Sequence, residues 1–443
     1  MASWLRRAYW NAFTLWHARG EGRLPYLPLE EILSIQARRV RSIVSHAYAT
    51  VPYYRQAMDE AGLRPGDFQT ADDLVRLPIL TGDQLARAPE QFLSSRYAGG
   101  RSLALYSSGT LGRRKTIYYD PAAIFLCLVH GHRQRHILAH FVGRTFGYRE
   151  MAIFRPNSQD ATLRSFYEAN CWVPRAIDLK RSALPASGRL EDNIQQINAF
   201  RPDVMFGYGS YLGTIFRWAW EHNVRLHRPK AVWYGSDQLA PADRRLIETE
   251  FGAPVFSTYQ ATEALRIAFQ CEQRAGFHVD LDHVAVRVID GNGHAVGPGG
   301  TGEIVVSNLT NRATVLLNYK LGDVVTWSRS ECPCGRSLPT VERIEGRADD
   351  LLVRPGNQVI HSAVVVAPLL AVPGVVRVQL VQNDLQHFSL RAVCAGGADW
   401  GQVRQALEAT LRSTLGDDIV ATLEQVDVIP PEPGGKVRTV ISR

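Results

Sequence analysis

The sequence predicts an α/β protein in which a large N-terminal domain, with layered mixed sheets and a β-meander, is followed by a small α+β domain. Short apolar runs alternate with helical stretches through the middle of the 443-residue chain, which favours an α/β layered core. Residues 284–306 instead have the pattern of consecutive strands separated by glycine-rich turns. About the last hundred residues contain enough strand and helix signals for a domain of their own. The length alone suggests about two or three domains.

The first helices are predicted near the start of the chain. Residues 1–20 interleave aromatic and aliphatic side chains with Arg6 and Arg7, a pattern typical of an amphipathic helix. Such a helix either lies on a membrane surface or packs its aromatic face on its own domain, and the second alternative is favoured. Residues 29–63 have apolar side chains at helical spacing, and Pro52 interrupts this pattern.

Strand and helix signals then follow one another along the rest of the chain. Before the meander, we predict strands at 103–106, 116–119, 204–208, 231–234 and 255–259, and helices at 122–138, 211–221 and 242–251. In the C-terminal part, we predict strands at 351–353, 375–381, 388–393 and near 426–429, with a helix at 400–415.

Composition bounds the class of partner. Lysine and arginine number 50 and aspartate and glutamate 43, so the net charge is +7. This mild excess favours anionic small molecules, and the absence of an RNA motif or a long basic run argues against nucleic acid. No stretch approaches the roughly 18 apolar residues of a membrane span, and no signal peptide is indicated. Six cysteines are too few for a disulfide scaffold. We expect a cytoplasmic protein with reduced thiols and no transmembrane segment, and a homodimer is compatible with the sequence.

Five segments carry residue types suited to nucleotide chemistry. The segment 107–115 is rich in hydroxyls, glycines and cations that can turn toward phosphate, although a hairpin turn with a basic tip explains it equally well. In the segment 259–263, a tyrosine ring can stack on a base and a carboxylate can hold Mg²⁺. The segments 319–323 and 346–350 place aspartates where they can accept from ribose hydroxyls. The segment 434–438 carries a lysine beside two glycines, and alone it would be interpreted as a frayed basic tail.

Taken in order, these segments resemble the motifs of the adenylate-forming (acyl-CoA synthetase-like) superfamily. The closest resemblance is to the phenylacetate–CoA ligase-like branch, to which residues 49–55, 77–80 and 319–353 also point. The resemblance extends from about Ser42 to the C-terminus. Five ordered motifs are specific for the superfamily and much less so for the substrate.

The resemblance implies roles for individual residues. The catalytic residues would be Lys436, Glu263 and Thr110, and Glu263 would also hold Mg²⁺. The nucleotide would contact Ser107, Ser108, Gly109, Thr110, Gly112, Gly235, Ser236, Asp237, Tyr259, Thr262, Asp323 and Arg347. The acyl pocket would be lined by Tyr208, Gly209 and Tyr234. Asp349 would be the hinge between residues 1–348, which bind ATP and the acid, and a mobile cap domain formed by residues 349–443.

The implied activity is ATP-dependent conversion of a small carboxylic acid to acyl-AMP, with release of pyrophosphate, followed by acyl transfer to CoA. The two pocket tyrosines suggest an aromatic acid. One alternative keeps the adenylation and transfers the acyl group to an amine or a carrier protein. A second alternative is a non-catalytic relative that binds a nucleotide or an acyl group. The chain has Leu111, Arg113 and Arg114 where the family often has Thr, Lys and Pro, and its match weakens again around Gly356. Use of CoA is therefore less secure than adenylation.

Cysteine and histidine spacing gives a separate signal. Cys271, His278, Cys332 and Cys334 offer three thiolates and one imidazole, which suit a closed tetrahedral Zn²⁺ site with a structural role. Both pairs flank the β-meander, so one metal would tie its ends together. The alternative is four unrelated residues, since the sequence also has lone cysteines.

Overall fold

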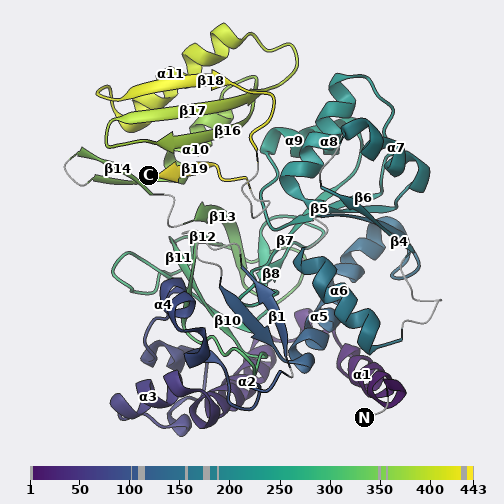
Figure 1. The fold of residues 1–443 in the computed structure, drawn as a ribbon, viewed down its shortest axis with the longest axis vertical. Coiled ribbons are helices and arrows are strands. Elements are labelled where there is room, and N and C mark those ends of the chain that lie inside the picture. Colours follow the sequence, from purple (N-terminus) through teal and green to yellow (C-terminus); the bar gives the residue numbers. More distant parts are fainter. Residues whose placement is uncertain are drawn as a thin grey trace. The chain divides into compact units, whose positions relative to one another are not determined.

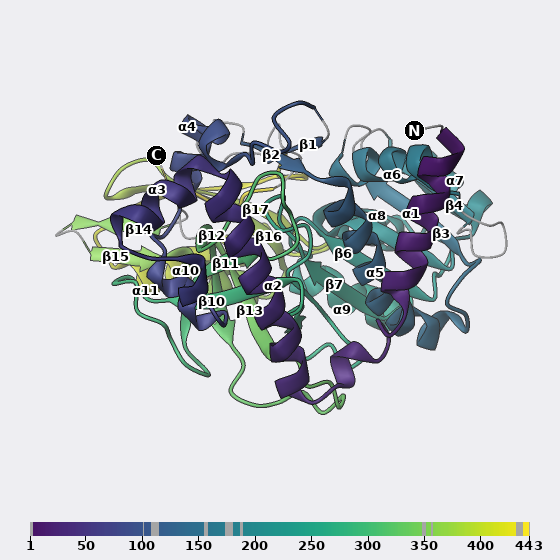
Figure 2. The ribbon, with the colours of Figure 1, turned by 90° about the horizontal axis from the view of Figure 1, so that it is seen from below.

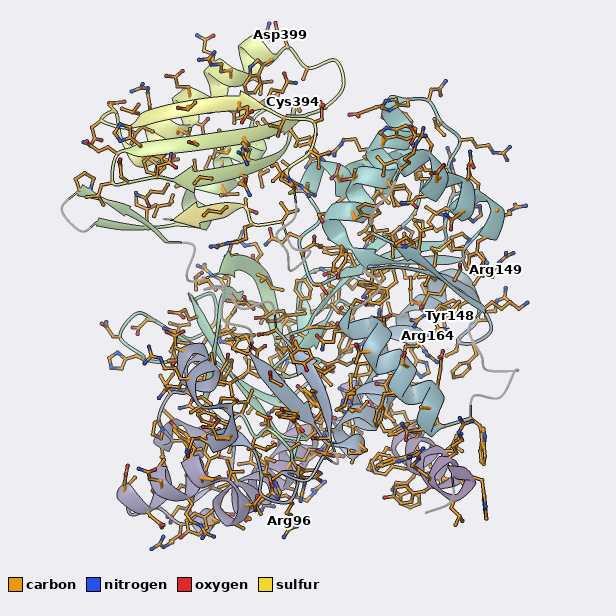
Figure 3. All side chains as sticks on the ribbon, in the orientation of Figure 1. Arg96, Tyr148, Arg149, Arg164, Cys394 and Asp399 are labelled. Atoms are coloured by element: carbon orange, nitrogen blue, oxygen red, sulfur yellow. The ribbon has the colours of Figure 1, made fainter. Side chains whose placement is uncertain are left out.

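The computed structural model describes residues 3–100, 102–107, 115–154, 158–172, 180–186, 189–347, 351–355, 358–430 and 437–442 (Figure 1). The chain divides into two compact units. Unit 1 comprises Met1–Tyr148, Pro156–Lys180 and Phe256–Ile344, and unit 2 comprises Arg149–Arg155, Arg181–Val255 and Glu345–Arg443. Tyr148 and Arg149, both labelled in Figure 3, mark the first passage of the chain from unit 1 to unit 2.

Helices make up much of the first half of unit 1. They are α1 (Ser3–Ala18), α2 (Leu29–Thr50), α3 (Pro52–Glu60), α4 (Gly82–Arg87), α5 (Pro121–Val142) and α6 (Gln159–Asn170). The predicted break at Pro52 is confirmed: Val51 before it is extended, and the fixed φ of proline suits the first turn of α3. Asp120 caps α5 by accepting from the Ala123 N–H at 3.1 Å, and Gly143 ends the helix with φ of 84°.

The strands of unit 1 form a hairpin and a larger, mainly antiparallel sheet. They are β1 (Leu103–Tyr106), β2 (Thr116–Tyr119), β7 (Val255–Tyr259), β8 (Ala268–Phe269), β9 (Phe277–Val279), β10 (Val284–Ile289), β11 (Thr301–Asn308), β12 (Tyr319–Trp327) and β13 (Thr340–Arg347). β1 pairs with β2, and the order of the other strands is β10-β11-β12-β13-β9-β8-β7. The predicted meander is confirmed, because β10, β11 and β12 pair antiparallel in sequence order. Apolar side chains of α2 and α3 pack with Ala285, Leu309, Val315 and Leu317 from the meander region.

Unit 2 begins with a parallel α/β layer. Its elements are β3 (Arg149–Phe154), β4 (Lys180–Pro185), α7 (Leu190–Phe200), β5 (Val204–Tyr208), α8 (Gly209–Glu221), β6 (Ala231–Gly235) and α9 (Pro241–Glu250). The strand order is β6-β5-β3-β4, and β3, β5 and β6 are parallel to one another. A core of apolar side chains, among them Met205, Ile215, Phe216 and Val232, fills the space between this sheet and its helices.

The C-terminal part of unit 2 has its own sheet and its own core. Its elements are the hairpin β14 (Leu351–Arg354) and β15 (Gln358–His361), then α10 (Ser362–Ala371), β16 (Val375–Gln382), β17 (His387–Cys394), α11 (Trp400–Leu415), β18 (Val420–Gln425) and β19 (Val440–Ser442). The four-stranded sheet has the order β18-β17-β16-β19. Apolar residues of α10 and α11, including Leu369, Leu407 and Leu411, pack with Leu380 and Leu390 of this sheet. The predicted α/β class with a small α+β C-terminal sheet is therefore confirmed.

One predicted strand is wrong. Residues 426–429 form no strand, because the pairing with β17 ends at Ala392 and Gln425. The apolar Ile429 that suggested a strand is instead buried against Val376 and Val393. Within the described residues, no helix is both long and apolar enough to cross a bilayer. Figure 2 shows the ribbon turned by 90°.

Candidate active site

The predicted magnesium ligand lies in a compact group of polar side chains in unit 1. Glu263 is almost buried, and its Oε1 lies 2.6 Å from the ammonium nitrogen of Lys115. The same ammonium group donates to the Tyr319 hydroxyl at 2.9 Å, and Tyr319 donates to Glu263 Oε1 at 3.3 Å. Lys115 follows the predicted phosphate loop directly before β2, and Tyr319 begins β12. The fold therefore brings a cation of the loop to the carboxylate that the sequence assigns to Mg²⁺.

The backbone around Glu263 is fixed by buried hydrogen bonds. The Tyr119 hydroxyl donates to the carbonyl of Thr262 at 2.8 Å, and Asn308 Nδ2 donates to the carbonyl of Glu263 at 3.3 Å. Burial raises the pKa of Tyr119 well above its usual value, so its hydroxyl stays a donor. The Thr262 hydroxyl donates to Gln159 Oε1 at 3.2 Å. These contacts fix the backbone from which the Glu263 side chain extends.

Two further predicted nucleotide contacts lie side by side in unit 1. The Tyr259 hydroxyl donates to Asp323 Oδ2 at 2.7 Å. Tyr259 ends β7 and Asp323 lies within β12, so the contact joins two strands that are not neighbours in the strand order and residues that are 64 positions apart. A phenol held by this bond keeps its ring in one orientation, as a stacking surface requires. Ser107, at the end of β1, closes the hairpin by donating its N–H to the carbonyl of Lys115 at 3.0 Å.

The predicted acyl-pocket residues lie together at the carboxyl ends of β5 and β6, in unit 2. Tyr208 ends β5, and its ring meets Phe154 edge-on with 5.1 Å between centroids; Phe154 in turn meets Phe206 at 4.9 Å. At Gly209 a Cβ would come within 2.7 Å of the Leu239 nitrogen and 2.8 Å of the Tyr234 ring. Only glycine fits there, because both neighbours are parts of the folded framework.

The segment predicted to border adenine, residues 235–237, also has structural contacts. Gly235 ends β6 and Ser236 has φ of 71°, which turns the chain toward α8. The Asp237 carboxylate accepts from the Ser210 N–H at 3.3 Å and from the Ser210 hydroxyl, and it thereby caps the start of α8. Burial raises the pKa of Asp237, and the hydrogen bonds from Ser210 oppose this effect. Asp237 therefore has a structural partner in addition to its predicted place beside the nucleotide.

Several predicted site residues lie outside the described part of the chain. They are Ser108, Gly109, Thr110, Gly112, Asp349 and Lys436. The backbone of Arg347 is described as the last residue of β13, and its side chain is not. The roles of these residues stay predictions.

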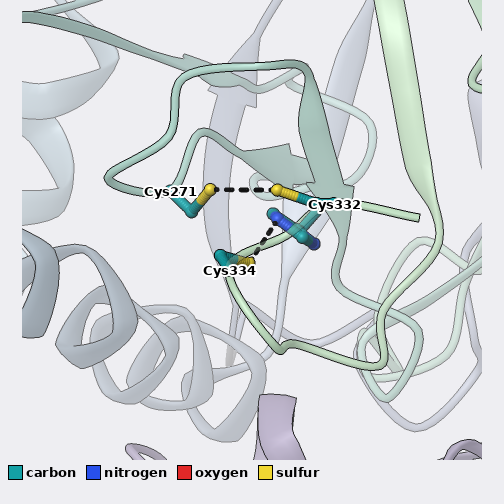
Figure 4. Close-up of side chains that lie close together, drawn as sticks. Cys271, Cys332 and Cys334 are labelled. Atoms are coloured by element: carbon teal, nitrogen blue, oxygen red, sulfur yellow. Dashed lines mark hydrogen bonds between the residues drawn. The ribbon is translucent and has the colours of Figure 1, made fainter. Parts of the chain in front are cut away.

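The predicted zinc ligands converge in unit 1 (Figure 4). Cys271 Sγ lies 3.6 Å from Cys332 Sγ, and Cys334 Sγ lies 3.3 Å from His278 Nε2. All four ligand atoms lie within 4.8 Å of one another, and the thiols are free. Tetrahedral Zn–S bonds of about 2.3 Å require sulfur atoms about 3.8 Å apart. The four donors are therefore close enough together to share one Zn²⁺ ion.

Neighbouring groups orient these donors. The imidazole of His278 donates from Nδ1 to the carbonyl of Leu338 at 3.1 Å, which leaves Nε2 as the atom facing Cys334. Burial raises the pKa of Cys271 to about 12. Burial acts in the same direction on Cys334, but hydrogen bonds from Arg336 outweigh it and lower the pKa of that thiol. A nearby cation thus already favours one thiolate of the set.

A second polar cluster of unit 1 was not predicted from the sequence. The guanidinium of Arg133, on α5, donates to Glu21 at 3.0 Å, to Asp282 at 2.9 and 3.0 Å, and also to Asp280. Glu21, His130 and Asp282 are close enough to suggest a metal site, but Arg133 already neutralises their charge. The only signal in the sequence was a charged segment, 280–283, directly after a strand.

Comparison with known proteins agrees with this architecture. The CapK C-terminal domain profile matches residues 352–443. The chain is 26% identical to a phenylacetate–coenzyme A ligase of Thermus thermophilus, over 94% of this chain and 98% of the relative. A solved 2-hydroxyisobutyryl-CoA ligase in the postadenylation state superposes with a TM-score of 0.75 at 19% identity, covering 95% of this chain and 91% of that one. The amide bond synthetase McbA from Marinactinospora thermotolerans superposes with a TM-score of 0.54 at 20% identity, covering 75% and 67%.

Both solved structures resemble this chain in fold. The Thermus relative resembles it in sequence along nearly the whole chain. The predicted resemblance of the chain to phenylacetate–CoA ligases is confirmed.

Proposed function

We propose that this protein is an ATP-dependent acid–CoA ligase that forms an acyl-AMP intermediate. The observation that carries the proposal is the match to a phenylacetate–coenzyme A ligase over 94% of the chain. The polar group of Lys115, Glu263 and Tyr319, and the pair of Tyr259 and Asp323, supply the charges and hydrogen bonds that such a site requires.

The chemistry explains why these residue types are needed. A carboxylate is a poor electrophile, and its attack on the α-phosphate brings two anions together, so cations must screen the approach. Lys115 supplies one cation beside Glu263. Mg²⁺, for which the carboxylate of Glu263 is a suitable ligand, would neutralise phosphate charge. Asp323 can accept from ribose hydroxyls, and Tyr259, oriented by Asp323, can stack on the base. Ser107 Oγ is buried without a partner among the described residues and suits a phosphate oxygen.

We further propose the domain boundary between residues 348 and 349, with Asp349 as hinge and Lys436 carried on a mobile cap. The separate core of the C-terminal part and the domain profile that begins at residue 352 support this boundary. A lysine on a rotating domain can enter for the first half-reaction and leave for the second.

We propose a small, flat acid as substrate. The aromatic rings of Phe154, Phe206 and Tyr208 gather beside Gly209, where no side chain fits. Aromatic rings beside a glycine that has no side chain favour an acid with a planar group of limited size. We expect the enzyme in the cytoplasm, in agreement with six free cysteines.

The test is a panel of carboxylic acids with pyrophosphate release as the readout, repeated with and without CoA. We expect release that depends on the acid and an acyl-CoA product. Turnover only when an amine is added would favour an amide ligase, for which the fold similarity to McbA is the supporting observation. No acid-dependent release, with nucleotide binding intact, would favour the non-catalytic alternative.

Lys436→Ala separates the half-reactions. Removing a positioned charge should slow formation of acyl-AMP by a factor on the order of 10² or more, because the charge acts on the developing anionic centre. Thioester formation from supplied acyl-AMP should change far less. Equal loss in both half-reactions would contradict the proposal that Lys436 acts in the first half-reaction and leaves the site for the second.

We also propose a structural Zn²⁺ held by Cys271, His278, Cys332 and Cys334. The compact arrangement of the ligand atoms supports it. Protein purified without added zinc should contain about one equivalent of zinc. Cys334→Ser should lose the metal and unfold at a lower temperature, whereas Cys394→Ser, in the C-terminal part, should retain it. Well under one equivalent in the wild-type protein would rule the site out.

A further inference from the structure

Helix α1 presents aromatic side chains on two opposite sides, and only one side is packed. The inner side is anchored to α5: the ring of Trp10 stacks on Phe125 with 4.6 Å between centroids and an angle of 11° between planes. Asn11 fixes the helix to the segment after α6, since its side chain donates to the carbonyl of Trp172 at 2.7 Å and accepts from its N–H at 2.9 Å. Figure 2 shows α1 alongside α5 at the periphery of unit 1. The helix is therefore a fixed platform and not a loose segment.

The outer side of α1 is apolar and exposed to solvent. Helical periodicity places Trp4, Leu5, Ala8, Tyr9, Ala12, Leu15, Trp16 and Arg19 on this side. Its five large apolar side chains are 43–67% exposed, and the side chain of Trp172 beside the helix is 46% exposed. The one charged member, Arg19, lies over the Trp16 ring at 5.4 Å. A soluble helix normally turns polar side chains outward, so a surface of this kind indicates a partner.

The charge around this surface is strongly one-sided. Residues 1–28 contain four arginines, Arg6, Arg7, Arg19 and Arg23, and a single acidic residue. That residue, Glu21, is buried and paired with Arg133. Helix α5, on which α1 packs, adds another arginine, Arg135, and several histidines, and it contains no acidic residue. Helix α6, which α1 also contacts, has Asp160 and Glu168, and Glu168 is paired with Arg164, so the arginines remain in excess. The partner must therefore tolerate apolar contact and carry negative charge.

We propose that the outer side of α1 binds the surface of an anionic phospholipid bilayer. Tryptophan and tyrosine combine an apolar ring with a polar tip and suit the headgroup level, and the flanking arginines suit lipid phosphates. A second copy of this chain fits less well, because pairing two such surfaces would bring the excess arginines of one copy against those of the other. The helix would lie in the plane of the membrane, since its inner side remains packed on α5. This inference does not depend on the proposed function.

The test is flotation of the full-length protein with vesicles of phosphatidylcholine alone or with about one quarter phosphatidylglycerol. We expect the wild-type protein to float with the anionic vesicles, with a partition coefficient at least about tenfold above that for the neutral ones, and to be released as salt rises from about 50 to 500 mM. Trp4→Ser/Tyr9→Ser/Trp16→Ser should lose at least about tenfold in partitioning. Trp220→Ser, which removes an equally exposed tryptophan from α8, should not.

A charge variant keeps the test independent of the aromatic substitutions. Arg6→Glu/Arg19→Glu leaves the aromatic rings in place and should lose the preference for anionic vesicles, about fivefold for each charge removed. Equal flotation of all variants would overturn the proposal. Failure of the wild-type protein to float would also overturn it. So would a wild-type dimer in sedimentation that the triple variant converts to a monomer without any vesicle binding, since the surface would then join two copies.

Discussion

Lys115 and Arg133 each hold carboxylates inside unit 1, but in different ways. Arg133 is 2% exposed, and its fork of N–H groups serves Glu21, Asp280 and Asp282 from two distant parts of the chain. Lys115 is 12% exposed and meets one carboxylate and one phenol beside the predicted phosphate loop. A guanidinium with several fixed partners holds the three acidic side chains together. An ammonium group with few partners can instead rearrange when a phosphate or a metal binds. We therefore interpret the Arg133 cluster, whose cation has several ion-pair partners, as structural. The Lys115 cluster, whose cation has few partners, is the candidate catalytic one.

The largest effect on stability should come from removing the ion pairs of Arg133. Arg133→Met leaves Glu21 and Asp280 without their ion-pair partner, and leaves Asp282 with Arg39 as its remaining guanidinium partner, so it should lower the free energy of unfolding by about 3–5 kcal/mol in urea titrations. Arg135→Met, two residues along α5, should change it by less than about 1 kcal/mol. If the two variants were equally stable, the Arg133 cluster would not stabilise the fold.

The next effect is a pH dependence centred on His283, which joins the two clusters. Its Nε2–H donates to the carbonyl of Ala264 at 2.9 Å, next to Glu263, and its ring meets His130 edge-on at 4.7 Å. Burial lowers the pKa of His283 from 6.5 to about 4. The folded state therefore favours the neutral ring. Its stabilising contribution is complete above pH 6.5 and is lost as the pH falls toward 4.

Between pH 7 and 4 this residue alone should account for up to about 3 kcal/mol of lost stability. His283→Gln should show a shallower decline in the free energy of unfolding over that range. The exposed His294→Gln should retain the wild-type slope. An unchanged slope in His283→Gln would mean that the ring does not titrate on unfolding.

The smallest effect should fall on activity. Lys115→Met should slow acid-dependent release of pyrophosphate by about tenfold or more, equivalent to about 1.4 kcal/mol, because one cation near the phosphates is lost. It should cost less stability than Arg133→Met, because it frees a single carboxylate. Lys320→Met, which removes a partly exposed ion pair with Glu303 between β12 and β11, should leave the rate within about twofold. A stable but fully active Lys115→Met protein would make this contact structural only.

Local patterns account for what could be predicted from the sequence. Strands such as Val204–Tyr208 and the helix Trp400–Leu415 were predicted with their observed bounds, since each is a clear apolar run or helical repeat. Strands β3, β4 and β19 and helices α7 and α10 were not predicted, because their apolar runs are short or resemble their surroundings. The resemblance pointed to Glu263, Tyr259 and Asp323. It could not reveal the contact of Glu263 with Lys115, 148 positions away, which only the tertiary fold produces.

The most direct test of the proposed function follows an oxygen atom. A substrate acid found in the panel, labelled with ¹⁸O in its carboxylate, should transfer one labelled oxygen to AMP when acyl-CoA is formed, because attack of the carboxylate on the α-phosphate leaves that oxygen on the nucleotide. Label recovered in pyrophosphate or phosphate, or unlabelled AMP during full turnover, would contradict an acyl-AMP intermediate.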